Sequence, residues 1–172
     1  MNPKSFPCRG LGHNRFWTST KTALFVLATI LTQAEGQTLP DALDNTLLWS
    51  TGGAAGWFGQ PSYTHDGVDA AMSSGIGDNQ ESWVETTVNG PGTIYFWWKV
   101  SSETNFDFLN FLVDGGTNRS ITGEVDWQLH TNSLAAGPHT LRWNYSKDKS
   151  FGTGLDRGFL DQVSFITPAA AG

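Results

Sequence analysis

The sequence predicts an all-β fold, a two-layer antiparallel β-sandwich of the jelly-roll type. After residue 36, short apolar runs alternate with clusters of Gly, Asn, Asp and Ser, which are residues that favour turns. In several of these runs apolar residues recur at every second position, which is the period of a strand with one buried face. No segment after residue 36 keeps a 3.6-residue apolar period over ten residues, so no long helix is expected.

The first 36 residues have the order of a secretory signal peptide. Basic residues without an acid come first, followed by the apolar run 23–31 and the small residues around Ala34 and Gly36. An apolar run of this length is typical of a signal and is shorter than the roughly 20 residues that span a membrane. We therefore expect cleavage after Gly36 and a mature chain that is secreted or displayed at the cell surface, with no membrane span.

Composition narrows the function classes. Without residues 1–36, six basic residues face fifteen acidic ones, a net charge near −9. A nucleic-acid ligand is thereby excluded, because binding to nucleic acid requires a basic surface. The single cysteine, Cys8, lies in the predicted signal, so the mature chain has no disulfide, thiolate metal site or cysteine nucleophile.

After a short lead at 37–46, the sandwich domain is expected to occupy residues 47–166, with a patternless and disordered tail at 167–172. The predicted strands are 47–50, 70–74, 82–88, 93–102, 107–114, 119–122, 127–133, 138–146 and 159–166. The run 93–102 alternates most regularly, and its outward face carries Tyr95 and Trp97. The residues predicted for the core are Ile94, Phe96, Trp98, Val100, Leu109, Phe111, Val113, Leu141, Trp143, Tyr145, Val163 and Phe165.

Four motifs carry a family resemblance. They are G-x-x-x-F-x-W at 92–98, D-F-L-x-F-x-V-D-G at 107–115, G-x-H-x-L-x-W-x-Y at 137–145 and L-D-x-V-x-F at 160–165. Their order resembles a module of large exported bacterial proteins and, more distantly, the MAM domain and related adhesin jelly rolls. The resemblance implies a two-sheet sandwich that serves binding or adhesion. The cysteines of eukaryotic MAM domains are missing, so their disulfides and pairing surface are not implied.

Catalytic motifs are missing from the mature sequence. His65, His130 and His139 remain there, and none belongs to an H-E-x-x-H motif. No serine lies in G-x-S-x-G. We therefore expect a non-catalytic module for an extracellular protein or cell-surface ligand. A small polysaccharide-active jelly-roll enzyme that uses Glu103, Asp107 or His130 stays open as an alternative.

A carbohydrate-binding module is the other alternative, because aromatic rings stack on sugars. Trp49, Trp83, Trp98 and Trp143 are expected in the core. The candidate stacking residues are Trp57, Tyr95, Trp97 and Trp127. A second interpretation of the Trp97–Trp98 pair places one ring in the core and the other beneath a loop.

Acidic turns suggest a calcium site. Asp66, Asp69 and Asp161 are the candidate ligands, because Ca²⁺ takes carboxylate and carbonyl oxygens from loops. Plain turn and capping roles are the alternative for these residues. Period two places Asp161 inward with Val163 and Phe165, where its carboxylate needs a partner such as Arg142, Arg157 or the backbone amides of turn 66–69.

Overall fold

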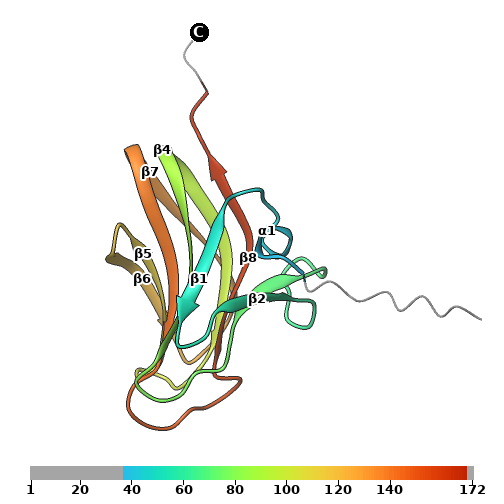
Figure 1. Ribbon diagram of the computed structural model, residues 1–172, viewed down its shortest axis with the longest axis vertical. Coiled ribbons are helices and arrows are strands. Elements are labelled where there is room, and N and C mark those ends of the chain that lie inside the picture. The colour runs from blue at the N-terminus through green and yellow to red at the C-terminus, as the bar shows by residue number, and fades with distance from the viewer. Residues whose placement is uncertain (1–36, 170–172) are drawn as a thin grey trace, which may run out of the picture. The chain divides into compact units, whose positions relative to one another are not determined.

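The computed structural model describes residues 37–169, which form one short helix and eight strands (Figure 1). The elements are α1 (Leu39–Ala42), β1 (Trp49–Gly53), β2 (Trp57–Gln60), β3 (Ala70–Ser73), β4 (Glu81–Ser101), β5 (Phe108–Val113), β6 (Gly116–Thr122), β7 (Glu124–Ser146) and β8 (Arg157–Ile166). The predicted signal and its cleavage point lie outside the described residues. Within 37–169, no helix is long and apolar enough to cross a membrane.

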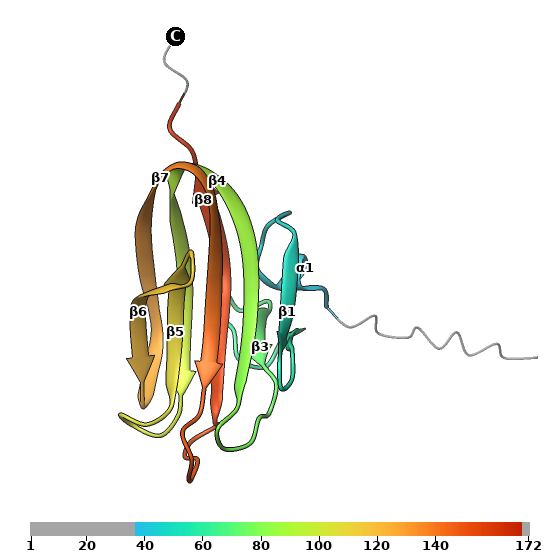
Figure 2. The same cartoon turned by 60° about the vertical axis from the view of Figure 1, so that its left-hand side comes forward.

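Two long strands connect both layers of the sandwich. β4 and β7 pair antiparallel from Glu81 opposite Ser146 to Ser101 opposite Glu124. The ladder shifts register between Gly90 and Gly92, and there both strands arch over at one end of the domain (Figure 2). Four separate strands were predicted in these segments, and that prediction is wrong. The chain bends at Asn89–Gly92, and its pairing with β7 continues on both sides of the bend.

Each half of the β4–β7 pair belongs to a different layer. The first sheet contains β1, residues 81–90 of β4, residues 137–146 of β7, β5 and β6. The second sheet contains β2, β3, β8, residues 92–101 of β4 and residues 124–134 of β7. All these pairings are antiparallel, so the predicted fold class is confirmed.

The core lies between the two sheets. Phe96 of the second sheet packs against Phe111 and Trp143 of the first, with ring centroids 4.8 and 5.0 Å apart. The residues predicted for the core are buried, except that Val113 and Phe165 are partly exposed at its border. Apolar burial is the main stabilising contribution to such a fold.

The lead at 37–46 is structured. The side chain of Thr38 accepts a hydrogen bond from the Asp41 amide and caps α1, and Pro40 occupies the first turn, where its missing N–H costs nothing. Ala42 and Leu43 are buried, and Leu43 belongs to the core. A Cβ at Gly59 of β2 would lie 2.9 Å from the Ala42 Cβ, so α1 packs closely on this strand.

Candidate functional site

The outer face of the second sheet carries the aromatic residues that the alternation predicted to point outward. Tyr95 and Trp97 are partly exposed and alternate with the buried Ile94, Phe96 and Trp98. Trp97 lies opposite Leu129 of β7, and Trp127 of the same strand is also partly exposed. Tyr95, Trp97 and Trp127 therefore come from two neighbouring strands.

A loop at residues 61–69 covers part of this face. Its His65 ring stacks on Trp97, with centroids 3.7 Å apart and planes 14° apart. The His65 and Trp127 rings are arranged edge to face, with centroids 6.1 Å apart. Tyr63 of the same loop packs on Phe159 of β8 at 5.3 Å. One face of the Trp97 ring is thus occupied by the protein itself, as the second interpretation of the Trp97–Trp98 pair expected.

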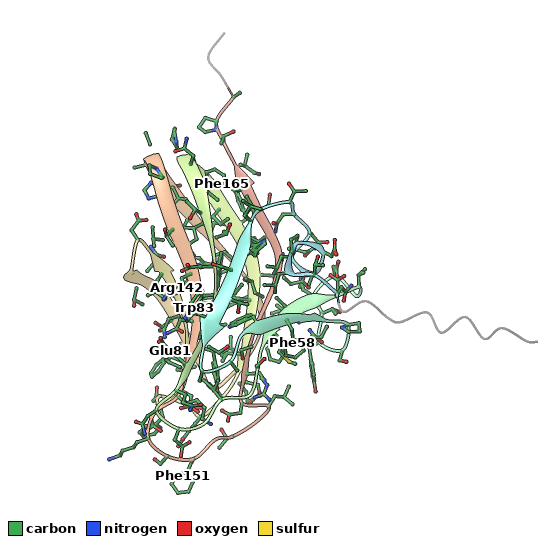
Figure 3. The ribbon with its side chains drawn as sticks, viewed as in Figure 1. Phe58, Glu81, Trp83, Arg142, Phe151 and Phe165 are labelled. Carbon is green, nitrogen blue, oxygen red and sulfur yellow. The ribbon has the colours of Figure 1, made fainter. Side chains whose placement is uncertain are left out.

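Two tryptophans lie elsewhere than predicted. Trp57 is only 4% exposed and belongs to the core, because residues 57–60 form strand β2 and turn its ring inward. Trp83 was expected in the core but is partly exposed on the outer face of the first sheet, since Ser82 and Val84 take the inward positions. The guanidinium of Arg142 lies 4.3 Å from the centre of the Trp83 ring (Figure 3).

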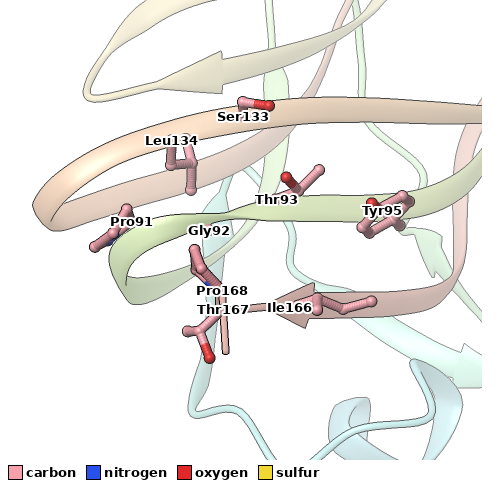
Figure 4. A pocket seen from close by; sticks show the side chains of 9 residues that line it. All are labelled: Pro91, Gly92, Thr93, Tyr95, Ser133, Leu134, Ile166, Thr167 and Pro168. Carbon is pink, nitrogen blue, oxygen red and sulfur yellow. The ribbon is translucent and has the colours of Figure 1, made fainter. Parts of the chain in front are cut away.

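The uncovered part of the second sheet contains a hollow beside Tyr95. It has a volume of about 370 Å³ and lies where β4 bends and β8 ends (Figure 4). Its wall combines the hydroxyl-bearing Thr93, Tyr95 and Ser133 with the apolar Leu134 and Ile166. This combination can place a ring against apolar atoms while hydroxyl groups form hydrogen bonds with a polar ligand.

A cluster of acidic residues lies where Asp66 of the covering loop approaches Asp44 and Asp161. One carboxylate oxygen from each of Asp44, Asp66 and Asp161 lies within 4.8 Å of the others. Asp69, which the sequence predicted as a ligand, is not among these three. It is 5% exposed, and its Oδ2 accepts a hydrogen bond from Gln37. Asp44 was missed because residues 37–46 were expected to be a short lead outside the domain, although Asp41 and Asp44 have the same spacing as Asp66 and Asp69.

Asp161 is the buried member of this cluster. It was predicted to face the core, and that orientation is wrong. Gln162 has a positive φ of 48°, and the β4–β8 ladder shifts register there. The shift creates a bulge, so Leu160 and Val163 both belong to the core while Asp161 lies opposite the outward Trp97.

The carboxylate of Asp161 is only partly satisfied by the protein. It is fully buried, and its Oδ2 accepts the His65 N–H at 2.6 Å, whereas Oδ1 receives no hydrogen bond. Burial raises the pKa of Asp161 to about 6, and the charges of Asp66 and Asp44 act in the same direction. The predicted backbone partners were the amides of turn 66–69, and the observed donor is the amide of His65, just before that turn. The two predicted arginine partners do not pair with Asp161, since Arg142 pairs with Glu85 and Arg157 donates to the Asp156 carbonyl.

The three histidines have structural surroundings. The His65 Nδ1 lies 2.7 Å from the Gln162 amide oxygen, in addition to the stack on Trp97. His130 lies against Phe96, Trp98 and Phe111, and burial lowers its pKa. His139 pairs with Asp114 at 2.7 Å.

Comparison with known proteins supports the fold. No protein-family model and no curated protein sequence matches the chain. Among the solved structures that are similar to it are the K3 and K2 cleaved adhesin domains of Lys-gingipain, the former from Porphyromonas gingivalis. The K3 domain has a TM-score of 0.52 at 14% identity, over 70% of this chain and 91% of that domain. The K2 domain has a TM-score of 0.52 at 16% identity, over 69% and 89%.

A secreted serine protease, VesC from Vibrio cholerae, also contains a similar region. The match has a TM-score of 0.49 at 21% identity and covers 58% of this chain but only 22% of the protease. The chain therefore spans less than a quarter of that protein. At 14% and 16% identity, the matches to the two adhesin domains show a shared β-sandwich fold.

Proposed function

We propose that this chain is an exported, non-catalytic binding module, and that its ligand is a carbohydrate held on the outer face of the second sheet beside Tyr95. The observation that carries the proposal is the hollow at this tyrosine, where an outward aromatic ring meets hydroxyl groups and apolar side chains. Sugars present both apolar ring faces and hydroxyl groups, and this wall complements both. Adhesin domains have the same fold, which is compatible with a binding role.

Neighbouring strands extend this polar and aromatic surface. Tyr95 lies opposite Thr131 of β7 and Ser164 of β8, and both of these residues are exposed. The Trp97 ring is stacked on His65, so we assign it to the border of the site and Tyr95 to its centre. Trp127 also belongs to the border. Trp57 is excluded because its ring is buried.

The test is retention of the mature domain, residues 37–172, on a panel of soluble and insoluble glycans. The wild-type domain should bind at least one glycan, and Tyr95→Ala should weaken that binding about tenfold or more, the equivalent of about 1.4 kcal/mol or more. Trp83→Ala, on the other sheet, is the matched control and should leave the affinity unchanged. Binding to protein ligands with no retained glycan would contradict the carbohydrate assignment, as would a folded Tyr95→Ala variant with full affinity.

We also propose that one Ca²⁺ binds at Asp44, Asp66 and Asp161. The unsatisfied Oδ1 of Asp161 and the spacing of the three carboxylates fit this ion, whose bonds to oxygen are about 2.3–2.6 Å long. Asp69 Oδ1 is also buried without a hydrogen bond, and the charge of Asp69 raises the pKa of Asp44. Bound calcium would neutralise the charges of these three carboxylates.

Calcium should raise the melting temperature of the mature domain, because it binds the native state only. Magnesium should substitute poorly, since it requires shorter bonds in octahedral geometry. Asp161→Asn should remove the part of the calcium effect that comes from this cluster. An unchanged melting temperature in the presence of a chelator would mean that these residues only form turns and hydrogen bonds.

A further inference from the structure

A second group of carboxylates lies at the end of the domain where β4 leads into β5 and β7 leads into β8. One oxygen from each of Glu103, Asp107 and Asp148 lies within 4.8 Å of the others. Two oxygens on opposite sides of a calcium ion are about 4.6–5.2 Å apart, given the usual bond lengths. The three carboxylates are therefore close enough to share one cation.

The burial of Asp107 is an independent reason to expect a ligand there. This residue is fully buried. Its Oδ1 accepts the Asp148 N–H at 3.0 Å, but its Oδ2 receives no hydrogen bond. The Oε2 of Glu103 is also buried without a hydrogen bond. Buried carboxylate oxygens are expensive unless a hydrogen bond, a cation or a proton satisfies them.

Lys147 supplies only part of the positive charge that this group requires. Its ammonium donates to Asp156 Oδ2 and lies 3.8 Å from Asp107 Oδ2. Asp156 also accepts the Tyr145 hydroxyl at 2.6 Å, so the Lys147–Asp156 pair is complete. One ammonium thus faces four carboxylates, and no other positive charge lowers the pKa of Glu103 or Asp107.

The pKa values of Glu103 and Asp107 agree with a shortage of positive charge around them. Burial, the largest cause, raises the pKa of both Glu103 and Asp107. The negative charges of Asp148 and Asp156 raise both further, whereas the Asp148 N–H and Lys147 partly oppose the change at Asp107. Either a divalent cation or a shared proton would relieve this repulsion.

We propose that Glu103, Asp107 and Asp148 form a second divalent-cation site, which binds Ca²⁺. The cation would join the turn at residues 102–107 to the loop at 147–156. These segments are already connected by the Asp148 N–H bond to Asp107, while the Asp148 carbonyl accepts the Asn79 N–H at 2.6 Å. The carboxylates are thus carried by backbone that the fold holds in place. The site is independent of the binding face and of the Asp44–Asp66–Asp161 cluster.

Calcium titration of the mature domain by calorimetry tests this site, with the first cluster inactivated by Asp161→Asn. The Asp161→Asn variant should still bind one Ca²⁺, and its melting temperature should rise with calcium concentration. Adding Glu103→Gln should weaken the remaining binding at least tenfold. Adding Asp78→Asn instead, an exposed acid in the neighbouring turn, should leave it unchanged.

Two outcomes would overturn the proposal. The first is an Asp161→Asn variant that is folded but binds no calcium, which would assign Glu103 and Asp107 to a shared proton. The second is equal weakening by Glu103→Gln and Asp78→Asn, which would indicate diffuse attraction by the acidic surface. Glycan retention, measured on the same variants, should be unaffected, so failure here is distinguishable from failure of the proposed carbohydrate function.

Discussion

His139 is held by acceptors at both of its ring nitrogens. Nδ1 lies 2.7 Å from Asp114 Oδ2, and Nε2 lies 3.1 Å from the Ala135 carbonyl oxygen. Only the imidazolium can donate to both. The hydrogen bond to Asp114 therefore raises the pKa of His139. In return, hydrogen bonds from His139 and from the Thr140 N–H lower the pKa of Asp114.

This pair gives stability a pH dependence. The contribution of His139 is complete below its ordinary pKa of 6.5 and is lost as pH rises through its raised value. Asp114 contributes above its ordinary 3.8, and that contribution is lost as pH falls through its lowered value. His139→Gln should therefore lower the melting temperature by about 1–3 °C near pH 5.5 and by less near pH 9. Thermal melts at both pH values check this, and equal losses would contradict it.

At the scale of single residues, the sequence predicts which side chains face outward only where alternation is unbroken. Tyr95 and Trp97 follow the rule within a regular strand. Asp161 does not, because a one-residue bulge reverses every later position and leaves no local signature. The partnership of Asp44 with Asp66 and Asp161 joins residues far apart in the chain, so spacing could not predict it.

At the scale of the elements, the bend of β4 brings its backbone very close to the neighbouring strands β7 and β8. A Cβ at Gly90 would overlap the Ala135 carbonyl oxygen of β7, and one at Gly92 would overlap the Phe165 ring of β8. Glycine is thus required where the strand passes from one sheet to the other. The sequence signals a turn at Asn89–Gly92 but not that pairing with β7 continues through it.

Gly90→Ala should destabilise the domain by about 2 kcal/mol or more, because the added methyl group meets rigid backbone. Gly116→Ala is the matched control. Its Cβ would meet only the Val113 carbonyl oxygen, at an ordinary 3.5 Å, so the change should be below about 0.5 kcal/mol. Urea unfolding followed by tryptophan fluorescence compares the two variants. Similar urea midpoints for the two variants would mean that the backbone at the bend can shift to accommodate the added methyl group.

For the molecule as a whole, stability rests on apolar contact between the sheets. Phe96 is at the centre of that contact, packed against Phe111, Trp98 and Trp143. Its neighbour Tyr95 points to the opposite side of the same strand. The fold class was predictable because this two-sided pattern recurs along the chain. The assignment of strand segments to the two sheets was not, since it depends on long-range pairing.

Phe96→Ala should lower the free energy of unfolding by about 3–5 kcal/mol, the usual cost of removing a large buried aromatic ring. Tyr95→Ala, one residue away, should cost much less, since its ring is partly exposed. Chemical denaturation of both variants measures the difference. Equal losses would mean that Tyr95 belongs to the core, and a loss of glycan binding in that variant would then reflect unfolding.

The continuity of β4 and β7 also bears on how the domain withstands force. Because each strand runs through both layers, the unfolding of either sheet breaks part of the ladder that extends from Glu81–Ser146 to Ser101–Glu124. Partial unfolding that frees one layer is therefore strongly disfavoured, and the domain should rupture in a single event when it is stretched. If the chain is exported and binds a glycan as proposed, unfolding in one step would keep the surface around Tyr95 intact until the entire fold fails.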